Sequence, residues 1–273
     1  LAMTVTRCGG RTTVIARSPA PAGRRSNPSR IITKFAPHYK LHMKKLVILT
    51  GAGMSQESGI RTFRETGGLW EEYDVNEVAS PEGWYKNRDL VLRFYNERRR
   101  QLADCLPNSG HKGVAALEKY FDVHVITQNV DNLHERAGST KILHLHGELT
   151  KARSTADPSL VYDIGYREIN NGDLCEKGSQ LRPHIVWFGE AVPMMDEAVR
   201  ITSSADIFAV IGSSLNVYPA AGLIAYAPKN ASLWLIDPND VFIPITKVNV
   251  IKEKASDGVA ILTERLLKLC NIK

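Results

Sequence analysis

The segment 46–64 constrains the fold of this chain more than any other part of the sequence. It opens with an unbroken apolar run, residues 46–49, which is typical of a strand buried on both faces of a parallel sheet. Gly51 and Gly53 follow and allow the backbone to turn sharply and to approach a ligand closely. Ser55 can cap a following helix, whose N-terminal amides attract a phosphate. The segment predicts a nucleotide-binding turn, although a plain strand-to-helix turn has the same pattern.

The positive charge of the chain is confined to its first residues. The net charge is +6 and the pI is near 9.1, but residues 1–43 contain eight Lys or Arg and no Asp or Glu. The remaining residues have 27 basic and 29 acidic side chains, a net charge of −2. This distribution gives no reason to expect a specific nucleic-acid partner.

Residues 1–43 have the composition of a leader, being rich in Arg, Ser, Pro and Gly. They offer little periodic apolar surface, so we expect them to be disordered. A tag or vector-derived leader is our preferred interpretation, and a transit peptide is the alternative.

Two further features bear on the compartment. No apolar run approaches the roughly 18 residues of a membrane helix, which argues against a membrane partner. Cysteines stand at positions 8, 105, 175 and 270, with no C-x-x-C pair, so we expect no disulfide framework and a cytoplasmic protein.

Strand and helix patterns alternate along the rest of the chain. Strands are expected at 46–49, 123–127, 141–145, 185–188, 207–211 and 232–236. Helices are expected at 87–105, 110–119, 195–203, 219–227 and 257–270. This alternation predicts an α/β fold with a doubly wound, Rossmann-like parallel sheet. Residues 151–181 break the pattern and are expected to form a smaller inserted module.

Polar or glycine clusters follow three of the expected strands, at 51–53, 128–131 and 212–214. Because an open parallel sheet builds its site at the carboxyl ends of its strands, we expect these clusters to share one site. The polar, glycine-containing segment 61–70 is expected to be a mobile loop that could fold over a ligand.

Six blocks of the sequence resemble the sirtuin family of NAD-dependent protein deacylases. They are GAGMSQESGIRTFR, TQNVDNLHERAG, HLHGEL, VWFGE, GSSLNVYPAAG and LIDPND, in that order. The resemblance covers about residues 44–267 and looks closest to bacterial sirtuins. It implies that 44–273 form the catalytic domain.

The resemblance implies that NAD is the cofactor and that five segments surround it. The implied residues are Gly51, Ala52 and Gly53 at the pyrophosphate, Phe63 and Arg64 on the flexible loop, Gln128, Asn129 and Asp131 at the ribose and nicotinamide, and Gly212, Ser213, Ser214 and Asp237 on the adenosine side. Asp237 stands where the family more often has Asn, so the chain departs from the family pattern at this adenosine contact.

Two histidines compete for the role of general base. His144 and His146 lie two residues apart on an expected strand and so point to the same side. Chemistry alone does not choose between them, whereas the resemblance implies His146, with Asn129 as a second catalytic residue. In the implied mechanism nicotinamide leaves, the acyl-lysine oxygen attacks C1′ of the ribose, and His146 takes a ribose hydroxyl proton. The acyl group passes to ADP-ribose.

The implied partners are acyl-lysine proteins or peptides, bound as an added strand by main-chain hydrogen bonds. The clamp residues are Val186, Trp187, Phe188, Gly189, Asn216, Val217 and Tyr218.

Tyr95 and Arg98 lie three residues apart on one face of the expected helix 87–105. The structural interpretation is a half-buried tyrosine beside an exposed arginine, because residues 98–100 could be a solvated basic face. In sirtuins, however, a Tyr-x-x-Arg pair resembles the signature of members that accept acidic acyl groups such as succinyl or malonyl. Arg98 can pair with a carboxylate and Tyr95 can donate a further hydrogen bond.

The chain departs from many sirtuins in its small module. Those proteins have four cysteines that bind a structural zinc, whereas Cys175 is the only cysteine between His146 and Trp187. We therefore predict no structural zinc and no other metal. Packing must then hold the module, and the candidate residues are Leu160, Tyr162, Ile164, Tyr166, Ile169 and Leu174.

Two other functions remain open. The first is an NAD glycohydrolase or mono-ADP-ribosyltransferase, and the second is a non-catalytic module that binds NAD or ADP-ribose. His146, Asn129 and Asp131 argue against the binding module, and the VWFGE and NVYP blocks argue against simple NAD hydrolysis.

Overall fold

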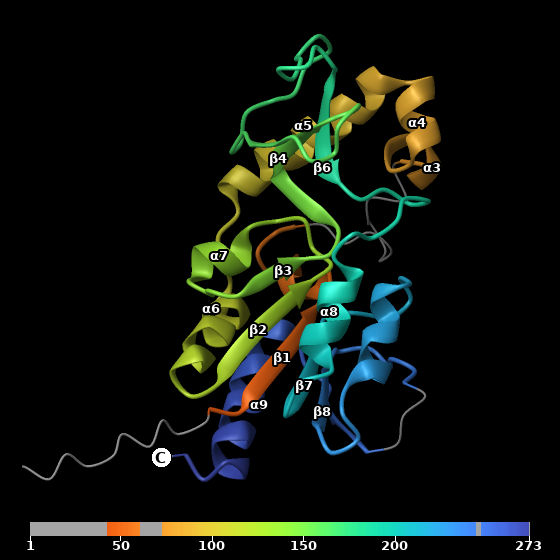
Figure 1. Ribbon diagram of the computed structural model, residues 1–273. Coiled ribbons are helices and arrows are strands. Elements are labelled where there is room, and N and C mark those ends of the chain that lie inside the picture. Colours follow the sequence, from red (N-terminus) through yellow and green to blue (C-terminus); the bar gives the residue numbers. More distant parts are fainter. Residues whose placement is uncertain (1–42, 61–72, 244–246, 273) are drawn as a thin grey trace, which may run out of the picture. The chain divides into compact units, whose positions relative to one another are not determined.

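The larger of two sheets is parallel throughout. The structure, a computed structural model, describes residues 43–60, 73–243 and 247–272. Within them the strand order is β3-β2-β1-β7-β8-β9 (Figure 1). The strands are β1 (Lys45–Thr50), β2 (Asp122–Thr127), β3 (Ile142–His144), β7 (Ile207–Ile211), β8 (Ser232–Ile236) and β9 (Val248–Ile251). The predicted doubly wound Rossmann-like sheet is confirmed.

Strand β1 is the centre from which the chain builds the sheet in both directions, first toward β2 and β3 and later toward β7, β8 and β9. The direction reverses between β1 and β7, and open α/β sheets bind ligands at such a point, outside the carboxyl ends of the strands. The fold therefore places the turns after β1 and β7 at the expected ligand position.

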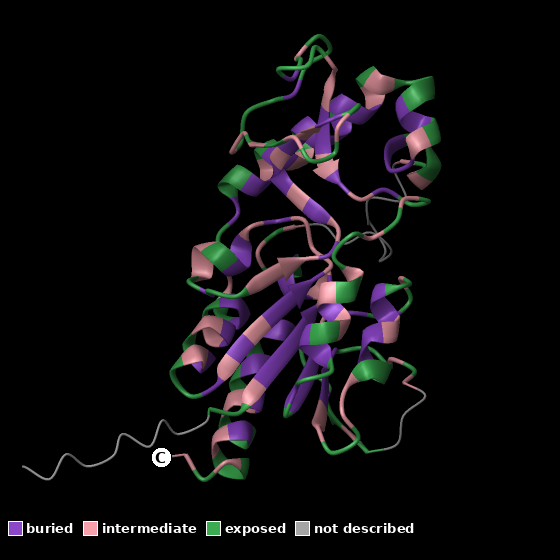
Figure 2. Cartoon of the chain, viewed as in Figure 1, coloured by how far each residue is buried: buried purple, intermediate pink, exposed green. Residues whose placement is uncertain are grey.

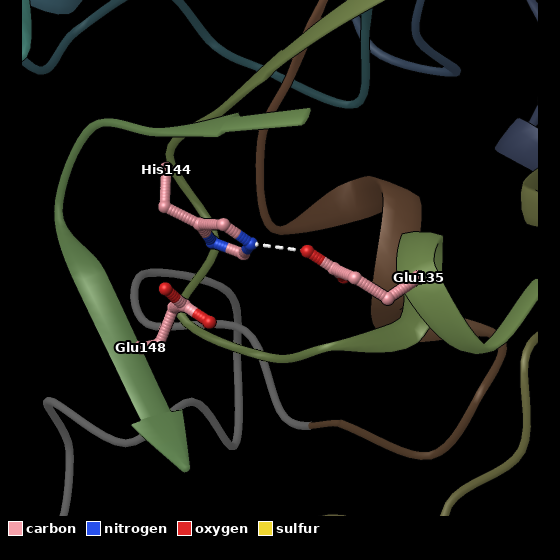
Figure 3. A group of neighbouring side chains, drawn as sticks. All are labelled: Glu135, His144 and Glu148. Carbon is pink, nitrogen blue, oxygen red and sulfur yellow. Dashed lines mark hydrogen bonds and ion pairs between the residues drawn. The ribbon is translucent and has the colours of Figure 1, made fainter. Parts of the chain in front are cut away.

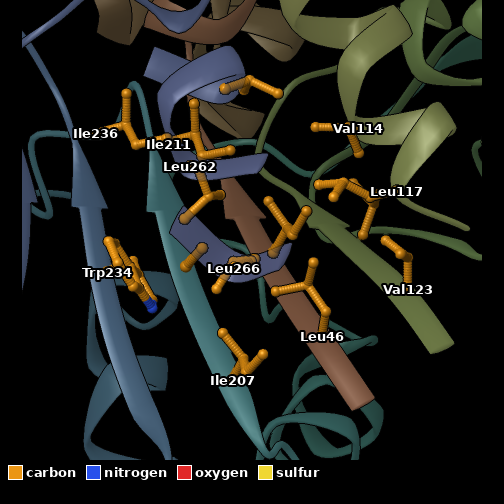
Figure 4. Packing of buried hydrophobic residues seen from close by; sticks show 14 of the residues in the cluster. Leu46, Val114, Leu117, Val123, Ile207, Ile211, Trp234, Ile236, Leu262 and Leu266 are labelled. Atoms are coloured by element: carbon orange, nitrogen blue, oxygen red, sulfur yellow. The ribbon is translucent and has the colours of Figure 1, made fainter. Parts of the chain in front are cut away.

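Helices cover both faces of this sheet. Alternate side chains of β1 point to opposite faces, and residues 46–49 are fully buried, as their unbroken apolar run predicts (Figure 2). One face packs against α6 (Ser109–Ala116) and α9 (Ala255–Leu269), with Leu46 beside Leu262 and Leu266 in the same cluster (Figure 4).

The opposite face of the sheet packs against α8 (Met195–Thr202) and the 3-10 helix η2 (Ala220–Tyr226). Burying each Leu or Ile side chain here stabilises the fold by roughly 1.5–3 kcal/mol. The remaining short elements are α1 (Gly53–Gln56), η1 (Leu117–Lys119) and α7 (Leu133–Ala137). No described helix combines the length and the apolarity that crossing a bilayer requires.

A second, antiparallel sheet has the order β5-β4-β6. Its strands are β4 (Gly147–Ser154), β5 (Val161–Asp163) and β6 (Leu181–Ile185), and it packs against α3 (Val75–Val78), α4 (Pro81–Lys86) and α5 (Arg88–Asp104). The helix starts are capped, because Ser80 accepts from the Gly83 amide and Asn87 accepts from the Leu90 amide. This sheet and these helices form the small lobe.

The small lobe differs from expectation in two ways. The strand expected at 185–188 is wrong, because β6 ends at Ile185 and belongs to the antiparallel sheet. Its apolar residues continue into a loop where Trp187 is buried and Phe188 is exposed. The packing expected through Tyr166 and Leu174 is also wrong, since both are exposed.

The core of the small lobe also draws on residues far apart in sequence, including Trp84, Phe94, Leu149, Ile185 and Trp187. Of the expected members, Ile169 is buried in this core and the partly buried Ile164 packs against it. In the larger sheet, β9 was not expected, because Asn249 interrupts its short apolar pattern. The helix expected at 219–227 is a 3-10 helix.

Candidate active site

The glycine turns meet where the strand order reverses. The Gly51 amide donates to the Ile211 carbonyl (3.0 Å), and the Gly53 amide donates to the Gly212 carbonyl (2.9 Å). A Cβ atom on Gly51 would lie 2.6 Å from the Gly212 oxygen, and Gly212 has a φ of 59°. Only glycine allows this backbone-to-backbone approach. The two predicted clusters at 51–53 and 212–214 are therefore brought together.

The turn after β2 lies behind these glycines and carries a polar network. Ser55 donates to Asp131 Oδ2 (2.9 Å), and the Asn129 side-chain amide donates to the Ser55 hydroxyl (3.0 Å). The prediction that Ser55 caps a helix is wrong, because α1 begins at Gly53 with no side-chain cap and Ser55 lies inside it. Its hydroxyl instead joins the first cluster to the second. Burial raises the pKa of Asp131, and the bonds from the Leu133 amide and Ser55 oppose that rise.

His146 is held in a single tautomer beside this turn. Its Nδ1 lies 3.1 Å from the Gln128 carbonyl oxygen, which can only accept, so Nδ1 carries the proton. Nε2 keeps its lone pair and makes no hydrogen bond within the described residues. Burial lowers the pKa of His146, with the bond to Gln128 opposing it, so the ring is neutral near pH 7. The Val186 amide donates to the His146 carbonyl (3.0 Å), which ties the VWFGE block to this residue.

His144 has a different environment. Its Nδ1 faces the Asn129 carbonyl (3.2 Å), and its Nε2 faces Glu135 Oε1 (2.7 Å) on α7 (Figure 3). Both partners are acceptors, so both ring nitrogens carry protons. Burial disfavours this charged ring, but the hydrogen bond and charge of Glu135 outweigh burial and raise the pKa of His144. His144 therefore has no lone pair available as a base.

Two more histidines are buried beneath the site. The rings of His111 and His134 pack edge to face with centroids 4.8 Å apart. His111 Nε2 lies 3.4 Å from the Ser55 hydroxyl, and His134 Nε2 lies 3.3 Å from the Thr50 hydroxyl. Burial lowers the pKa of His111 to about 4 and holds the pKa of His134 well below its ordinary value, so both rings are neutral.

On the small lobe, Tyr95 lies fully buried on α5. Its hydroxyl accepts from the Trp187 indole nitrogen (3.0 Å), which leaves the hydroxyl proton available to another partner. Burial raises the pKa of Tyr95 to about 12, with the charge of Arg98 opposing it, so the phenol is protonated. The Arg98 guanidinium carbon lies 5.9 Å from the centre of the Tyr95 ring. Burial lowers the pKa of Arg98, and the charges of Tyr95 and Asp131 oppose that shift.

The three consecutive arginines of α5, residues 98–100, have three environments. Arg99 is fully buried and donates to the Leu149 carbonyl (2.6 Å) and to Asn96 (2.6 Å). Arg100 is exposed and pairs with Glu168 at 3.8 Å. The interpretation of residues 98–100 as one solvated basic face is therefore wrong.

Glu190 ties the small lobe together. It accepts from Arg182 (2.7 Å), from Arg153 (3.1 Å) and from the Trp187 amide (2.8 Å). Arg182 also stacks on the Trp187 ring, 3.2 Å from its centroid. Burial disfavours ionised Glu190, but these bonds outweigh burial and lower its pKa. Trp187 is thus fixed from three sides.

The other predicted site residues differ in their hydrogen bonds and in their exposure. The amides of Val186, Trp187 and Phe188 bond within the chain, to His146, Glu190 and Ala79 respectively. Ser213 is buried, whereas Gly189, Ser214, Asn216 and Tyr218 are exposed and Ala52 and Val217 are partly buried. Asp237 is buried and accepts from the Asn239 amide. Phe63 and Arg64 lie outside the described residues.

The residues present fit a dinucleotide. The glycine turns after β1 and β7 meet main chain to main chain where the strand order reverses, which is the position at which open α/β sheets bind ligands. The Gln128 side-chain nitrogen is buried and lacks a hydrogen-bond partner within the described residues, so it can donate to a bound group.

The side chains of the described residues do not support a metal site, because the clustered potential ligands already bond to one another or to a lysine. Across the described ranges, one group of three potential ligands lies within 4.8 Å of one another, namely Glu135, His144 and Glu148 (Figure 3). His144 already donates to Glu135, and Lys151 pairs with Glu148 (2.5 Å), so we interpret the group as an ion-pair cluster. Cys175 is not part of it, and its thiol contacts Ser154 (3.4 Å). The absence of a structural zinc remains a prediction.

Sequence reasoning missed the roles of Ser55, His111, His134, Glu135 and Glu190. Ser55 and Glu190 stand inside recognised blocks, but their partners come from other segments, and spacing along the chain does not reveal such contacts. His134 and Glu135 are polar residues in a helix that also carries the buried Leu133, which is a weak signal.

The fold and site define a dinucleotide-binding protein of the Rossmann-like class. The model of the Sir2 family matches residues 51–219. An NAD-dependent protein deacylase of Bacteroides thetaiotaomicron is 55% identical over 234 residues, covering 82% of this chain and 99% of that protein. The chain therefore belongs to the Sir2 family, the sirtuins, as its six blocks predict.

Solved structures agree with this assignment. A Sir2 homologue in complex with NAD has a TM-score of 0.75 and 37% identity, covering 83% of this chain and 91% of that one. A Sir2 variant with a deacetylated p53 peptide and 3′-O-acetyl ADP-ribose has a TM-score of 0.71 and 30% identity, covering 82% of this chain and 94% of that one.

Proposed function

We propose that this chain is an NAD-dependent protein-lysine deacylase that transfers the acyl group to ADP-ribose and releases nicotinamide. The observation that carries the proposal is the neutral His146 ring, with Nδ1 bonded to the Gln128 carbonyl and Nε2 left with its lone pair. Family membership and relatives that carry the name of this activity support it.

The residues around the site have separate tasks. Bound NAD would supply a ribose carbon from which nicotinamide leaves and an ADP-ribose group to receive the acyl chain. Gly51, Ala52 and Gly53 would line the pyrophosphate and Gly212 the adenosine side, where the glycines allow a close approach of the main chain. Asn129 and Asp131 would orient the ribose and nicotinamide. His146 would accept a ribose hydroxyl proton at Nε2, with the bond at Nδ1 fixing the ring.

We further propose that the acyl site favours acidic chains such as succinyl and malonyl. Tyr95 is protonated and its proton is not used by Trp187, so its hydroxyl can donate to an acyl carboxylate. Arg98 places a positive charge beside the Tyr95 ring, and this charge interacts with the carboxylate of Asp131. A carboxylate between them would gain charge-assisted hydrogen bonds in a partly desolvated place.

The peptide would lie along residues 186–189 and 216–218. Because the amides of Val186, Trp187 and Phe188 are already bonded, the added strand would use other main-chain groups of these segments. The described cysteines are free thiols, which suits the cytoplasm that we propose.

The test is to incubate the protein with NAD and with matched acetyl-lysine and succinyl-lysine peptides, following nicotinamide and peptide mass. We expect both peptides to be deacylated and succinyl to be preferred. Arg98→Met should lower kcat/KM for succinyl by about tenfold or more and leave acetyl within about twofold. Arg100→Met is the matched control, because Arg100 is exposed on the same helix.

Nicotinamide release without peptide turnover would support the glycohydrolase or ADP-ribosyltransferase alternative, and NAD binding without any turnover would support the binding module. A wild type that shows no succinyl preference removed by Arg98→Met would overturn the acyl proposal alone.

We also propose that the small lobe holds no structural zinc. Chelation with EDTA should leave the Tm unchanged, and elemental analysis should give far less than one zinc per chain. A stoichiometric zinc whose removal lowers the Tm would contradict this proposal.

A further inference from the structure

We propose that His144 and Glu135 are positioning residues that hold the main chain of Asn129 in place for NAD binding. This inference rests on the proposed function, because it assumes that Asn129 faces the cofactor. It assigns a task to the histidine that the chain offers as a rival to His146.

His144 and His146 each donate a hydrogen bond to a different main-chain carbonyl. His146 Nδ1 donates to the Gln128 carbonyl and His144 Nδ1 donates to the Asn129 carbonyl. Two successive carbonyls of one turn are thus held by the last residue of β3 and by the residue two positions further on. The Asn129 amide donates to the Thr127 hydroxyl (3.0 Å), and its side chain donates to Ser55. Asn129 is therefore fixed at its amide, its carbonyl and its side chain.

Glu135 completes the arrangement from α7. Its carboxylate accepts from His144 Nε2 at 2.7 Å, which orients the ring so that Nδ1 points at the Asn129 carbonyl. The His144 side chain is only 9% exposed and that of Glu135 is 39% exposed. The pair thus joins α7, β3 and the NAD turn through one chain of two hydrogen bonds.

The titratable and charged groups that face His144 come from three elements. They are Glu135 and the neutral His134 on α7, Glu148 with its partner Lys151 on β4, and Asp131 on the turn itself. The carboxylates outweigh burial and raise the pKa of His144. The facing acceptors at both ring nitrogens are the geometric reason to assign the ring two protons. If Nε2 loses its proton at higher pH, Nε2 and the Glu135 carboxylate become two acceptors that face each other. The hydrogen bond that orients the ring is then lost.

The experiment measures NAD binding by calorimetry for the full chain and for substituted chains. His144→Leu should weaken NAD binding by about tenfold or more, because it leaves the Asn129 carbonyl without its charged donor. His144→Asn should recover most of the affinity, since its amide can donate at the position of Nδ1. The KM for the peptide should change little.

His124→Leu is the matched control. His124 also lies on a strand beside a carboxylate, Asp122 at 3.3 Å, but it is near the amino end of β2, away from the NAD turn. Its removal should leave NAD binding unchanged. Equal weakening in His144→Leu and His124→Leu would overturn the proposal in favour of a general loss of stability.

A spectroscopic readout separates positioning from mere packing. At pH 7 the ring nitrogen signals of His144 should show two protonated nitrogens, and those of His146 should show the neutral Nδ1–H tautomer. In wild type, NAD binding should weaken as pH rises through the His144 pKa. Glu135→Gln should suppress that weakening, because a glutamine amide can donate to neutral Nε2. A neutral His144 at pH 7 would overturn the proposal.

Two outcomes distinguish this inference from the proposed function. If wild type does not bind NAD, the proposed function fails. If wild type binds NAD and His144→Leu binds equally well, only the positioning role fails. All measurements are repeated with EDTA and with added zinc, and an effect of His144→Leu seen only with zinc would overturn positioning in favour of a metal site.

Discussion

The parallel sheet and the small lobe build their parts of the site in opposite ways. At the sheet, the groups that would meet NAD are main chain and turn residues at the ends of β1, β2 and β7, placed by strand register. In the small lobe, the proposed acyl site depends on single side-chain contacts, such as the bond between Tyr95 and Trp187, which are 92 residues apart. The first part is specified by the fold, and the second by a few side chains.

This difference predicts how each part tolerates change. Substitutions at the sheet edge should damage cofactor chemistry for every substrate, because all substrates share NAD. Substitutions in the small lobe should change the choice of acyl group or the stability of that lobe, and leave NAD chemistry largely intact.

The largest effect is expected for His146→Asn. Asparagine can still donate to the Gln128 carbonyl but offers no base at Nε2, so kcat should fall on the order of a thousandfold for acetyl and succinyl peptides alike. Because burial holds the pKa of His146 below the ordinary 6.5, the wild-type kcat/KM should fall only as pH drops below that value. NAD binding is the control and should be retained, and a loss confined to one acyl group would break the comparison.

Gly212→Ala should have the next largest effect. The new Cβ would overlap the Met54 amide, and alanine would have to adopt a φ of 59°, so we expect a loss of stability of about 3 kcal/mol. Urea unfolding measures the loss, and Gly178→Ala is the control, because it has a φ of 74° but open space around its Cβ. Equal losses in the two variants would show that backbone strain alone matters and that the turns are not closely packed.

The sequence predicted the sheet better than the small lobe, for a physical reason. The apolar run 46–49, Gly51 and Gly53 report local requirements, namely burial on both faces and a sharp turn, so the pattern alone was sufficient. Their positions in the site needed no knowledge of distant partners beyond the order of the strands.

The roles that the sequence left open depend on acceptors supplied by other segments. His144 and His146 differ only because one ring meets Glu135 and the other does not. Arg98 and Arg99 are neighbours, yet Arg99 is buried against Leu149 on another element. Such differences are set by packing, which a pattern along one segment does not contain.

Glu190→Gln tests whether the small lobe depends on its ion pairs. Removing the charge should destabilise the protein by about 2 kcal/mol, because Arg182 and Arg153 lose their shared carboxylate in a partly buried place. Since the pKa of folded Glu190 is lowered, its contribution is present above the ordinary value of 4.5 and is lost as pH falls through the folded pKa. The stability gap between wild type and variant should therefore close in acid, and a gap that persists there would show that packing, not charge, is responsible.

The smallest effect, a loss of about 1 kcal/mol in transition-state binding of the succinyl substrate, is expected for Tyr95→Phe. This variant gives the sharpest test of the difference between the parallel sheet and the small lobe. Phenylalanine keeps the ring among Phe94 and Trp187 but removes both the acceptor for the indole and the donor for an acyl carboxylate. The kcat/KM for succinyl should fall about fivefold, whereas acetyl should change less, because an acetyl group has no carboxylate to bind. Since the indole loses its partner in both cases, equal losses for the two peptides would mean that Tyr95 only positions Trp187. A loss confined to succinyl would instead assign the hydroxyl to the acyl group, and the small lobe would then choose substrates by a contact that the sheet does not share.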